Sequence, residues 1–195
     1  MTRQGEVRRI TYCGDPVLHR PASRVREIDD SVRKLLDDMG RTMFEADGLG
    51  LAAAQVGVPL AVVVIRADAD AEDDSVIELI NPRMIEVEGE ADGYEGCLSL
   101  PTLRGAVIRP ARAVVEAIDR EGNEIVIEGE GIMARCFAHE LDHLAGRVFI
   151  DVVDPESLCW LRPDEREDTG YRTEPTTLDE ARKSFDRLRE QRKGS

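Results

Sequence analysis

The sequence predicts an α+β fold, with mostly antiparallel strands around one central helix and a further helix near each end of the chain. Short apolar runs rich in Val and Ile dominate the middle of the 195-residue chain, as is typical of strands. Apolar side chains recur at helical spacing in three other segments, one near each end and one between them. This distribution favours α+β.

The first predicted helix covers residues 30–46. Asp29, Asp30 and Ser31 are candidate N-caps, and we expect the helix to end before Gly48. Its apolar side chains lie at helical spacing: Val32, Leu35, Leu36, Met39, Met43 and Phe44.

Five apolar runs are typical of strands: 60–66, 76–80, 84–88, 113–119 and 124–128. Asn81-Pro82 separates the second run from the third, which predicts two strands there. Residues 120–123, with the sequence Arg-Glu-Gly-Asn, join the last two runs and predict a hairpin.

The two later helices are predicted over residues 132–144, ended by Gly146, and over residues 178–193. A polar, proline-containing connection over residues 163–177 leads to the last one. We therefore expect one compact domain over residues 1–162, and a connection with a basic amphipathic helix within residues 163–195.

The charge balance limits the classes of partner. Lys and Arg total 26 against 40 Asp and Glu, so 26 − 40 gives a net charge of −14, and 42% of the residues are hydrophobic. This composition supports one real core, while the charge disfavours DNA and anionic membrane surfaces as partners. An acidic run at residues 67–74 is interpreted as a solvated loop.

Nothing in the sequence predicts export or a membrane span. No apolar stretch follows the arginines near the N-terminus, and residues 51–65 are too short and too interrupted to cross a bilayer. Four cysteines lie far apart: Cys13, Cys97, Cys136 and Cys159. Together these features predict a cytoplasmic protein with reduced thiols.

The strongest chemical signal is the segment His139-Glu140-Leu141-Asp142-His143 in the predicted central helix. Four residues make about one helical turn, so both imidazoles project from one face and can reach one metal ion. The alternative is a polar helix face that matches this pattern by chance. His19 is expected at the surface.

A catalytic metal ion usually takes three protein ligands, so a third must come from elsewhere. Cys136 lies on the same helix face, but it is about 10 Å along the axis from His143, too far for both to bind one ion. Cys97 stands in a Gly-Cys turn closed by Pro101, which would hold a thiolate at a fixed angle. A thiolate with two imidazoles suits Zn²⁺ or Fe²⁺.

Residues 48–55, GLGLAAAQ, combine small residues with the amide of Gln55. Such a segment allows a backbone to approach a ligand closely, but taken alone it more often reflects close packing of a helix on a sheet.

Three segments together resemble the peptide deformylase family: GLGLAAAQ at 48–55, EGCLS at 95–99 and HELDH at 139–143, in the family's order. The resemblance extends over residues 12–22, 80–82, 104–110 and 143–151, and thus to about Asp154. It implies a hydrolase that removes the N-formyl group from the N-terminal methionine of newly synthesised proteins and releases formate.

The resemblance also implies a metal site. Cys97, His139 and His143 would bind Fe²⁺, for which Zn²⁺, Ni²⁺ or Co²⁺ can substitute. Asp142 would lie behind this site, where it would accept a hydrogen bond from a ligand histidine or anchor the helix.

The resemblance also implies catalytic roles for the residues at matching positions. Glu140 would be the general base, while the Gln55 side-chain amide and the Leu98 backbone N–H would stabilise the oxyanion, and Gly50 would shape the wall around the substrate. Leu49, Ile132 and Cys136 correspond to the family's methionine pocket. One departure is Ala138, where the family usually has Gln, and it affects local packing only.

The C-terminal helix carries six bases against two acids between residues 182 and 193. A C-terminal helix docks on the ribosome in some similar deformylases, so ribosomal RNA is a possible partner of this helix beside formyl-methionyl nascent peptides. A solvated helix face is the alternative.

Two alternative functions, which belong to different classes of protein, compete with deformylation. A zinc metallopeptidase shares the HExxH pattern, but it would draw its third ligand from a downstream residue, and no histidine follows His143. A metal-binding or ribosome-associated protein without activity would need neither Glu140 nor Gln55.

Overall fold

The computed structural model describes residues 5–67 and 75–193, so the predicted acidic loop at 67–74 lies almost wholly outside the described residues. The helices are α1 (Asp30–Glu45), α2 (Ile132–Leu144) and α3 (Leu178–Lys193). The strands are β1 (Gly50–Ala52), β2 (Val62–Arg66), β3 (Val76–Glu88), β4 (Ala91–Cys97), β5 (Leu100–Arg109), β6 (Arg112–Ile118), β7 (Glu124–Glu130), β8 (Cys159–Pro163) and β9 (Tyr171–Pro175).

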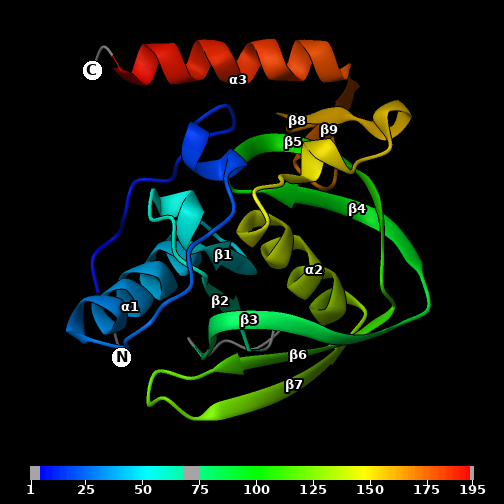
Figure 1. Ribbon diagram of the computed structural model, residues 1–195. Coiled ribbons are helices and arrows are strands. Elements are labelled where there is room, and N and C mark those ends of the chain that lie inside the picture. Colours follow the sequence, from blue (N-terminus) through cyan, green and yellow to red (C-terminus); the bar gives the residue numbers. More distant parts are fainter. Residues whose placement is uncertain (1–4, 68–74, 194–195) are drawn as a thin grey trace.

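The named strands form two antiparallel sheets, one in the order β1-β2-β3-β6-β7 and the other in the order β4-β5-β8-β9. Helix α2 lies in the centre of the molecule between them, while α1 and α3 lie at its periphery (Figure 1). The predicted α+β class, with mostly antiparallel strands around a central helix, is confirmed.

Strand β2 is buried on both faces because two helices cover it. Val62 and Val64 pack in the apolar cluster that contains the α1 side chains, and Val63 and Ile65 pack in the cluster that contains Phe137 of α2. Adjacent strand residues face opposite sides, so the alternation fixes which helix each side chain meets. A third cluster, which includes Phe149, Trp160 and Phe185, joins the second sheet to α3.

The three predicted helices are confirmed, and α2 and α3 have the predicted bounds. The Asp29 side chain caps α1 by accepting from the Val32 N–H at 3.0 Å, and α1 ends one residue earlier than predicted. The two strands predicted on either side of Asn81-Pro82 are wrong, because β3 is continuous through these residues. Asn81 has a φ of +53°, and the pairing register with β6 shifts between Ile80 and Arg83, so a bulge accommodates the proline.

Strands β1, β4, β5, β8 and β9 carry no clear apolar alternation, and the sequence did not predict them. The predicted polar connection over residues 163–177 includes β9, which pairs with β8 as an edge strand. The expected boundary between residues 162 and 163 falls inside β8. Across the described residues, no helix is both long and apolar enough to cross a membrane.

Candidate metal centre

Three side chains from two elements converge between the sheets. Cys97 ends β4, whereas His139 and His143 project from one face of α2, and one ligand atom of each lies within 4.8 Å of the others. The Cys97 Sγ lies 3.3 Å from the His143 Nε2. One thiolate and two imidazoles at this spacing fit a single Zn²⁺-like or Fe²⁺-like ion.

Glu95 orients one of these histidines. Its carboxylate accepts a hydrogen bond from the His139 Nδ1 at 2.9 Å, which leaves the Nε2 free to bind an ion. Burial opposes ionisation of Glu95, but the hydrogen bonds from His139 and Arg109 outweigh it and lower its pKa to about 2. A charged carboxylate therefore lies behind the ligand at neutral pH, as is common where imidazole binds metal.

Two arginines, the buried Arg109 and the partly buried Arg135, hold this carboxylate in turn. The Arg109 guanidinium donates to Glu95 at 2.8 and 3.0 Å and to Asp142 at 2.6 Å, and Arg135 donates to Glu95 at 2.9 Å. Asp142 was predicted either to accept a hydrogen bond from a ligand histidine or to anchor the helix. Its carboxylate pairs with Arg109 and Arg147, which fits the anchoring role. Sequence reasoning missed Glu95, Arg109 and Arg135, although the first two lie inside the EGCLS and RGAVIRP segments.

Glu140 lies beside the ligands and is 3% exposed. Burial raises its pKa to about 7, which gives this carboxyl a pKa close to working pH, and its Oε2 has no hydrogen-bond partner in the described structure. A Cβ at Gly50 would lie 2.6 Å from the Glu140 Oε1 and 2.9 Å from the Cys136 Sγ. Only glycine at position 50 therefore leaves room for Glu140 in this position.

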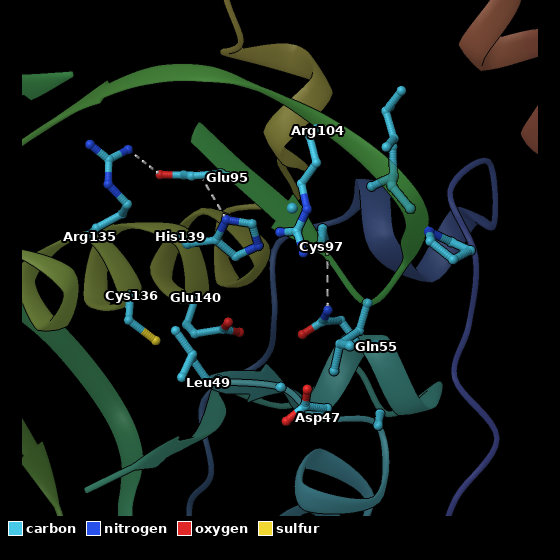
Figure 2. A pocket seen from close by; sticks show the side chains of 18 of the residues that line it. Asp47, Leu49, Gln55, Glu95, Cys97, Arg104, Arg135, Cys136, His139 and Glu140 are labelled. Atoms are coloured by element: carbon cyan, nitrogen blue, oxygen red, sulfur yellow. Dashed lines mark hydrogen bonds and ion pairs between the residues drawn. The ribbon is translucent and has the colours of Figure 1, made fainter. Parts of the chain in front are cut away.

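The Gln55 amide also points at the centre. Its Oε1 accepts from the Ala52 N–H at 2.7 Å, which leaves the Nε2 to donate to the Cys97 Sγ at 3.5 Å. Figure 2 shows Gln55, Cys97, His139 and Glu140 around one cavity. Leu98, in the turn after β4, borders the same cavity beside Gly48.

The family model described as "Polypeptide deformylase" matches residues 7–158, which is more than half of the chain. A peptide deformylase from Acetivibrio thermocellus is 49% identical over 147 residues, which cover 75% of this chain and 84% of that protein.

The chain belongs to the polypeptide deformylase family.

Solved structures of deformylases agree with this assignment. A peptide deformylase from Legionella pneumophila superposes with a TM-score of 0.76 at 33% identity, covering 97% of this chain and 99% of that one. A Synechococcus elongatus peptide deformylase in complex with actinonin gives 0.73 at 37% identity over 79% and 88% of the two chains. The chain is thus a deformylase, an enzyme that hydrolytically removes the N-formyl group from the methionine of newly synthesised proteins.

The deformylase cavity has a volume of about 560 Å³. Its lining includes Leu49, Ile132 and Cys136, whose assignment to a methionine pocket stays a prediction. Leu49 and Ile132 expose 37% and 55% of their surface. Burial raises the pKa of the Cys136 thiol well above its ordinary value, so it stays protonated and apolar. His19 is exposed, as predicted.

Proposed function

We propose that Cys97, His139 and His143 bind the catalytic metal ion of this deformylase, and that Fe²⁺ is the resident ion, with Zn²⁺, Ni²⁺ or Co²⁺ as substitutes. The convergence of the three ligand atoms supports this assignment, since no other group of three such side chains in the described ranges comes as close together. When bound, the ion would polarise the formyl oxygen and lower the pKa of water in the site.

Glu140 is the general base in this proposal. It takes a proton from the attacking water and returns it to the leaving amine of methionine, which completes hydrolysis of the formamide and releases formate. A carboxyl with a pKa of about 7 is suited to both transfers, because it can hold and give up the proton near neutral pH. Its unpartnered Oε2 is available to the reacting groups.

Gln55 and Leu98 stabilise the oxyanion that forms at the formyl carbon. The Gln55 Nε2 already points into the cavity because its Oε1 is held by Ala52, so little reorganisation is needed as charge develops. The Leu98 N–H is the second donor. Gly50 has no side chain and so leaves space for the substrate beside Glu140. Loss of one such donor typically raises the barrier by about 3–4 kcal/mol.

The observation that carries this function is the position of Glu140 in one cavity with Cys97 and His139, beside a glycine at which a Cβ would crowd the Glu140 carboxylate. Protein purified without oxygen should release formate from a formyl-Met tripeptide and should not hydrolyse the acetyl-Met analogue. Release of acetate at a similar rate would contradict deformylation, and cleavage of an internal peptide bond instead would favour a metallopeptidase.

The ligand assignment has a direct test in the cysteines. Cys97→Ser should lose bound metal and activity, because a hydroxyl is a poor ligand for a soft metal at neutral pH. Cys159→Ser, at a buried cysteine outside the cavity, should retain both, and Cys136→Ser should retain the metal. Metal retained by Cys97→Ser but lost by Cys136→Ser would mean that the other cysteine is the ligand.

The identity of the metal is tested by exposure to air. An iron ion beside a thiolate invites oxidation, so activity of the iron form should decay in air and be protected when Co²⁺ or Ni²⁺ replaces it. Full activity of the iron form after long aerobic exposure would overturn the assignment of iron.

We also propose that the enzyme acts in the cytoplasm and that the helix following the catalytic part, taken as residues 1–162, docks on ribosomal RNA. Two of the six helix bases are already engaged, since Arg182 pairs with Asp151 and Arg189 with Asp186. The Arg192 and Lys193 side chains lie outside the described residues, and Lys183 and Arg187 are exposed. Deleting residues 180–195 should weaken co-sedimentation with ribosomes at low salt. Unchanged co-sedimentation would mean that α3 is only a solvated helix and does not bind the ribosome.

A further inference from the structure

A second cavity of about 450 Å³ lies between the second sheet and α3. Trp160 and Arg162 of β8 contribute one side, and Ser184, Arg187, Leu188 and Gln191 of α3 contribute the other. The Trp160 ring packs on Phe185 with 5.7 Å between ring centroids, so the sheet and the helix that border this groove are joined by a buried aromatic pair.

This groove adjoins the metal-centre cavity. Pro101 and Thr102 of β5 line both cavities, so one two-residue ridge separates them. Thr102 has a φ of +64°, which is a strained conformation for a β-branched residue. A chain that leaves the metal centre over this ridge therefore enters the second groove next.

The groove is basic although the protein is acidic. The Arg162 Cζ lies 5.3 Å from the centroid of the Trp160 ring, and its Nε donates to Glu174 at 3.2 Å. Glu174 also pairs with Arg172, so two arginines share this one carboxylate. Arg187 donates its Nε to the Lys183 carbonyl, and no carboxylate pairs with it among the described side chains. On the other side of the ridge, Arg104 is an exposed arginine that borders the first cavity.

We infer that this groove binds the downstream part of the formylated polypeptide and favours acidic side chains there. The inference rests on the proposed function, because the substrate must first be anchored by its formyl-methionine. Long-range charge gives the opposite expectation, since a protein of net charge −14 attracts basic peptides and repels acidic ones. A preference for acidic peptides therefore has to come from the local arginines.

The experiment compares three peptides that begin with formyl-Met and three neutral residues, followed by three Glu, three Gln or three Lys. At low salt, kcat/KM should be about two- to fivefold higher for the Glu peptide than for the Gln peptide, and lowest for the Lys peptide. The difference should lie in KM with kcat unchanged, because contacts far from the formyl group bind substrate and transition state equally. It should vanish at about 1 M salt.

Arg187→Glu tests the groove itself and should remove the preference for the Glu peptide. The matched control is Arg33→Glu, which makes the same change of charge on α1, away from α3 (Figure 1). Should Arg187→Glu disturb α3, as judged by circular dichroism, Arg187→Gln provides the milder change.

Equal kcat/KM for the three peptides, or a preference that survives in both Arg187 variants, would overturn the inference. A formyl-Met tripeptide lacks the charged downstream residues, so the parent enzyme and the Arg33→Glu control should hydrolyse it alike. Failure of the parent enzyme on that tripeptide would refute the proposed function instead, so the two failures are distinguishable.

Discussion

Helices α2 and α3 both contact the second sheet, but different interactions join them to it, and the apolar face of α2 with Phe137 packs on the first sheet instead. From α2, the Arg135 guanidinium donates to the carbonyls of Ala91, Gly93 and Val107 on β4 and β5, and Asp142 pairs with buried Arg109. Helix α3 instead inserts Phe185 beside Trp160 and leaves its ion pairs at the surface.

This difference distinguishes α2, which carries metal-ligand side chains, from α3, which is attached to the sheet by apolar packing. Breaking a buried ion pair strands a charge and costs about 3–5 kcal/mol, whereas an exposed pair contributes about 0–1 kcal/mol. The polar contacts of α2 hold its metal-ligand side chains in place, while those of α3 contribute little to its packing. We therefore expect changes on α2 to affect catalysis and changes on α3 to leave hydrolysis of short substrates intact.

The largest effect is expected at Glu140, at the centre of α2. Glu140→Gln keeps the three metal ligands but removes the base, so formate release should fall by about 10²- to 10⁴-fold while metal content stays unchanged. Parallel measurement of bound metal and single-turnover rate checks both parts. Unchanged formate production would refute the role of Glu140.

Next in size is the loss of the buried arginine. Arg109→Leu leaves Glu95 and Asp142 without their shared partner, so the free energy of unfolding should fall by about 3–5 kcal/mol. Arg189→Leu removes a partly exposed arginine from α3 and should change the free energy of unfolding by no more than about 1 kcal/mol. Urea denaturation of both variants measures the contrast, and equal losses would remove the distinction between the two helices.

Phe185→Ala probes the attachment of α3 alone. The side chain is 1% exposed, so its loss should weaken the packing of α3 by about 3 kcal/mol and open the helix to limited proteolysis. Hydrolysis of a formyl-Met tripeptide should persist, because no metal-ligand side chain is on α3. A parallel loss of tripeptide hydrolysis would show that α3 supports the catalytic site.

The smallest effect concerns the helix N-termini. The Thr177 hydroxyl accepts from the Glu180 N–H at 3.3 Å, and Glu180 accepts from the Thr177 N–H at 3.2 Å, which caps α3. By contrast, the N-cap of α2 is Gly131, which offers no side-chain cap. The Thr177 hydrogen bonds lower the pKa of Glu180 below 4.5. The cap is therefore complete above pH 4.5 and is lost as pH falls through the lowered pKa.

Amide hydrogen exchange should thus show the first turn of α3 fraying on acidification before that of α2. Glu180→Gln keeps an uncharged acceptor in the capping position, so fraying in this variant should not depend on pH. The same acid-induced fraying in Glu180→Gln would exclude the carboxylate as its cause.

The sequence predicted the parts of this fold whose signal is local. The apolar spacing of α1, α2 and α3 and the one-turn separation of His139 and His143 are properties of single helices. Strands β4 and β9 were missed because their glycines and exposed polar residues leave no apolar alternation. Strand continuity through Pro82 was missed because the bulge forms only when β3 pairs with β6.

The supporting residues of the site were missed for a related reason. Glu95 and Arg109 are fourteen residues apart on neighbouring strands, and Arg135 comes from another element, so their contact exists only in the folded chain. A buried Arg and Glu are indistinguishable in sequence from exposed ones. The metal-ligand set followed from family motifs, whereas its hydrogen-bonded support required the three-dimensional structure.

The central claim is that Cys97, together with the two histidines of α2, holds one catalytic ion. X-ray absorption of the zinc-loaded enzyme tests it directly, since one sulfur at about 2.3 Å and two imidazole nitrogens at about 2.0–2.1 Å should surround the ion. The sulfur contribution should disappear in Cys97→Ser and persist in Cys136→Ser. An ion without sulfur in the parent enzyme, or a sulfur that persists in Cys97→Ser, would contradict the account.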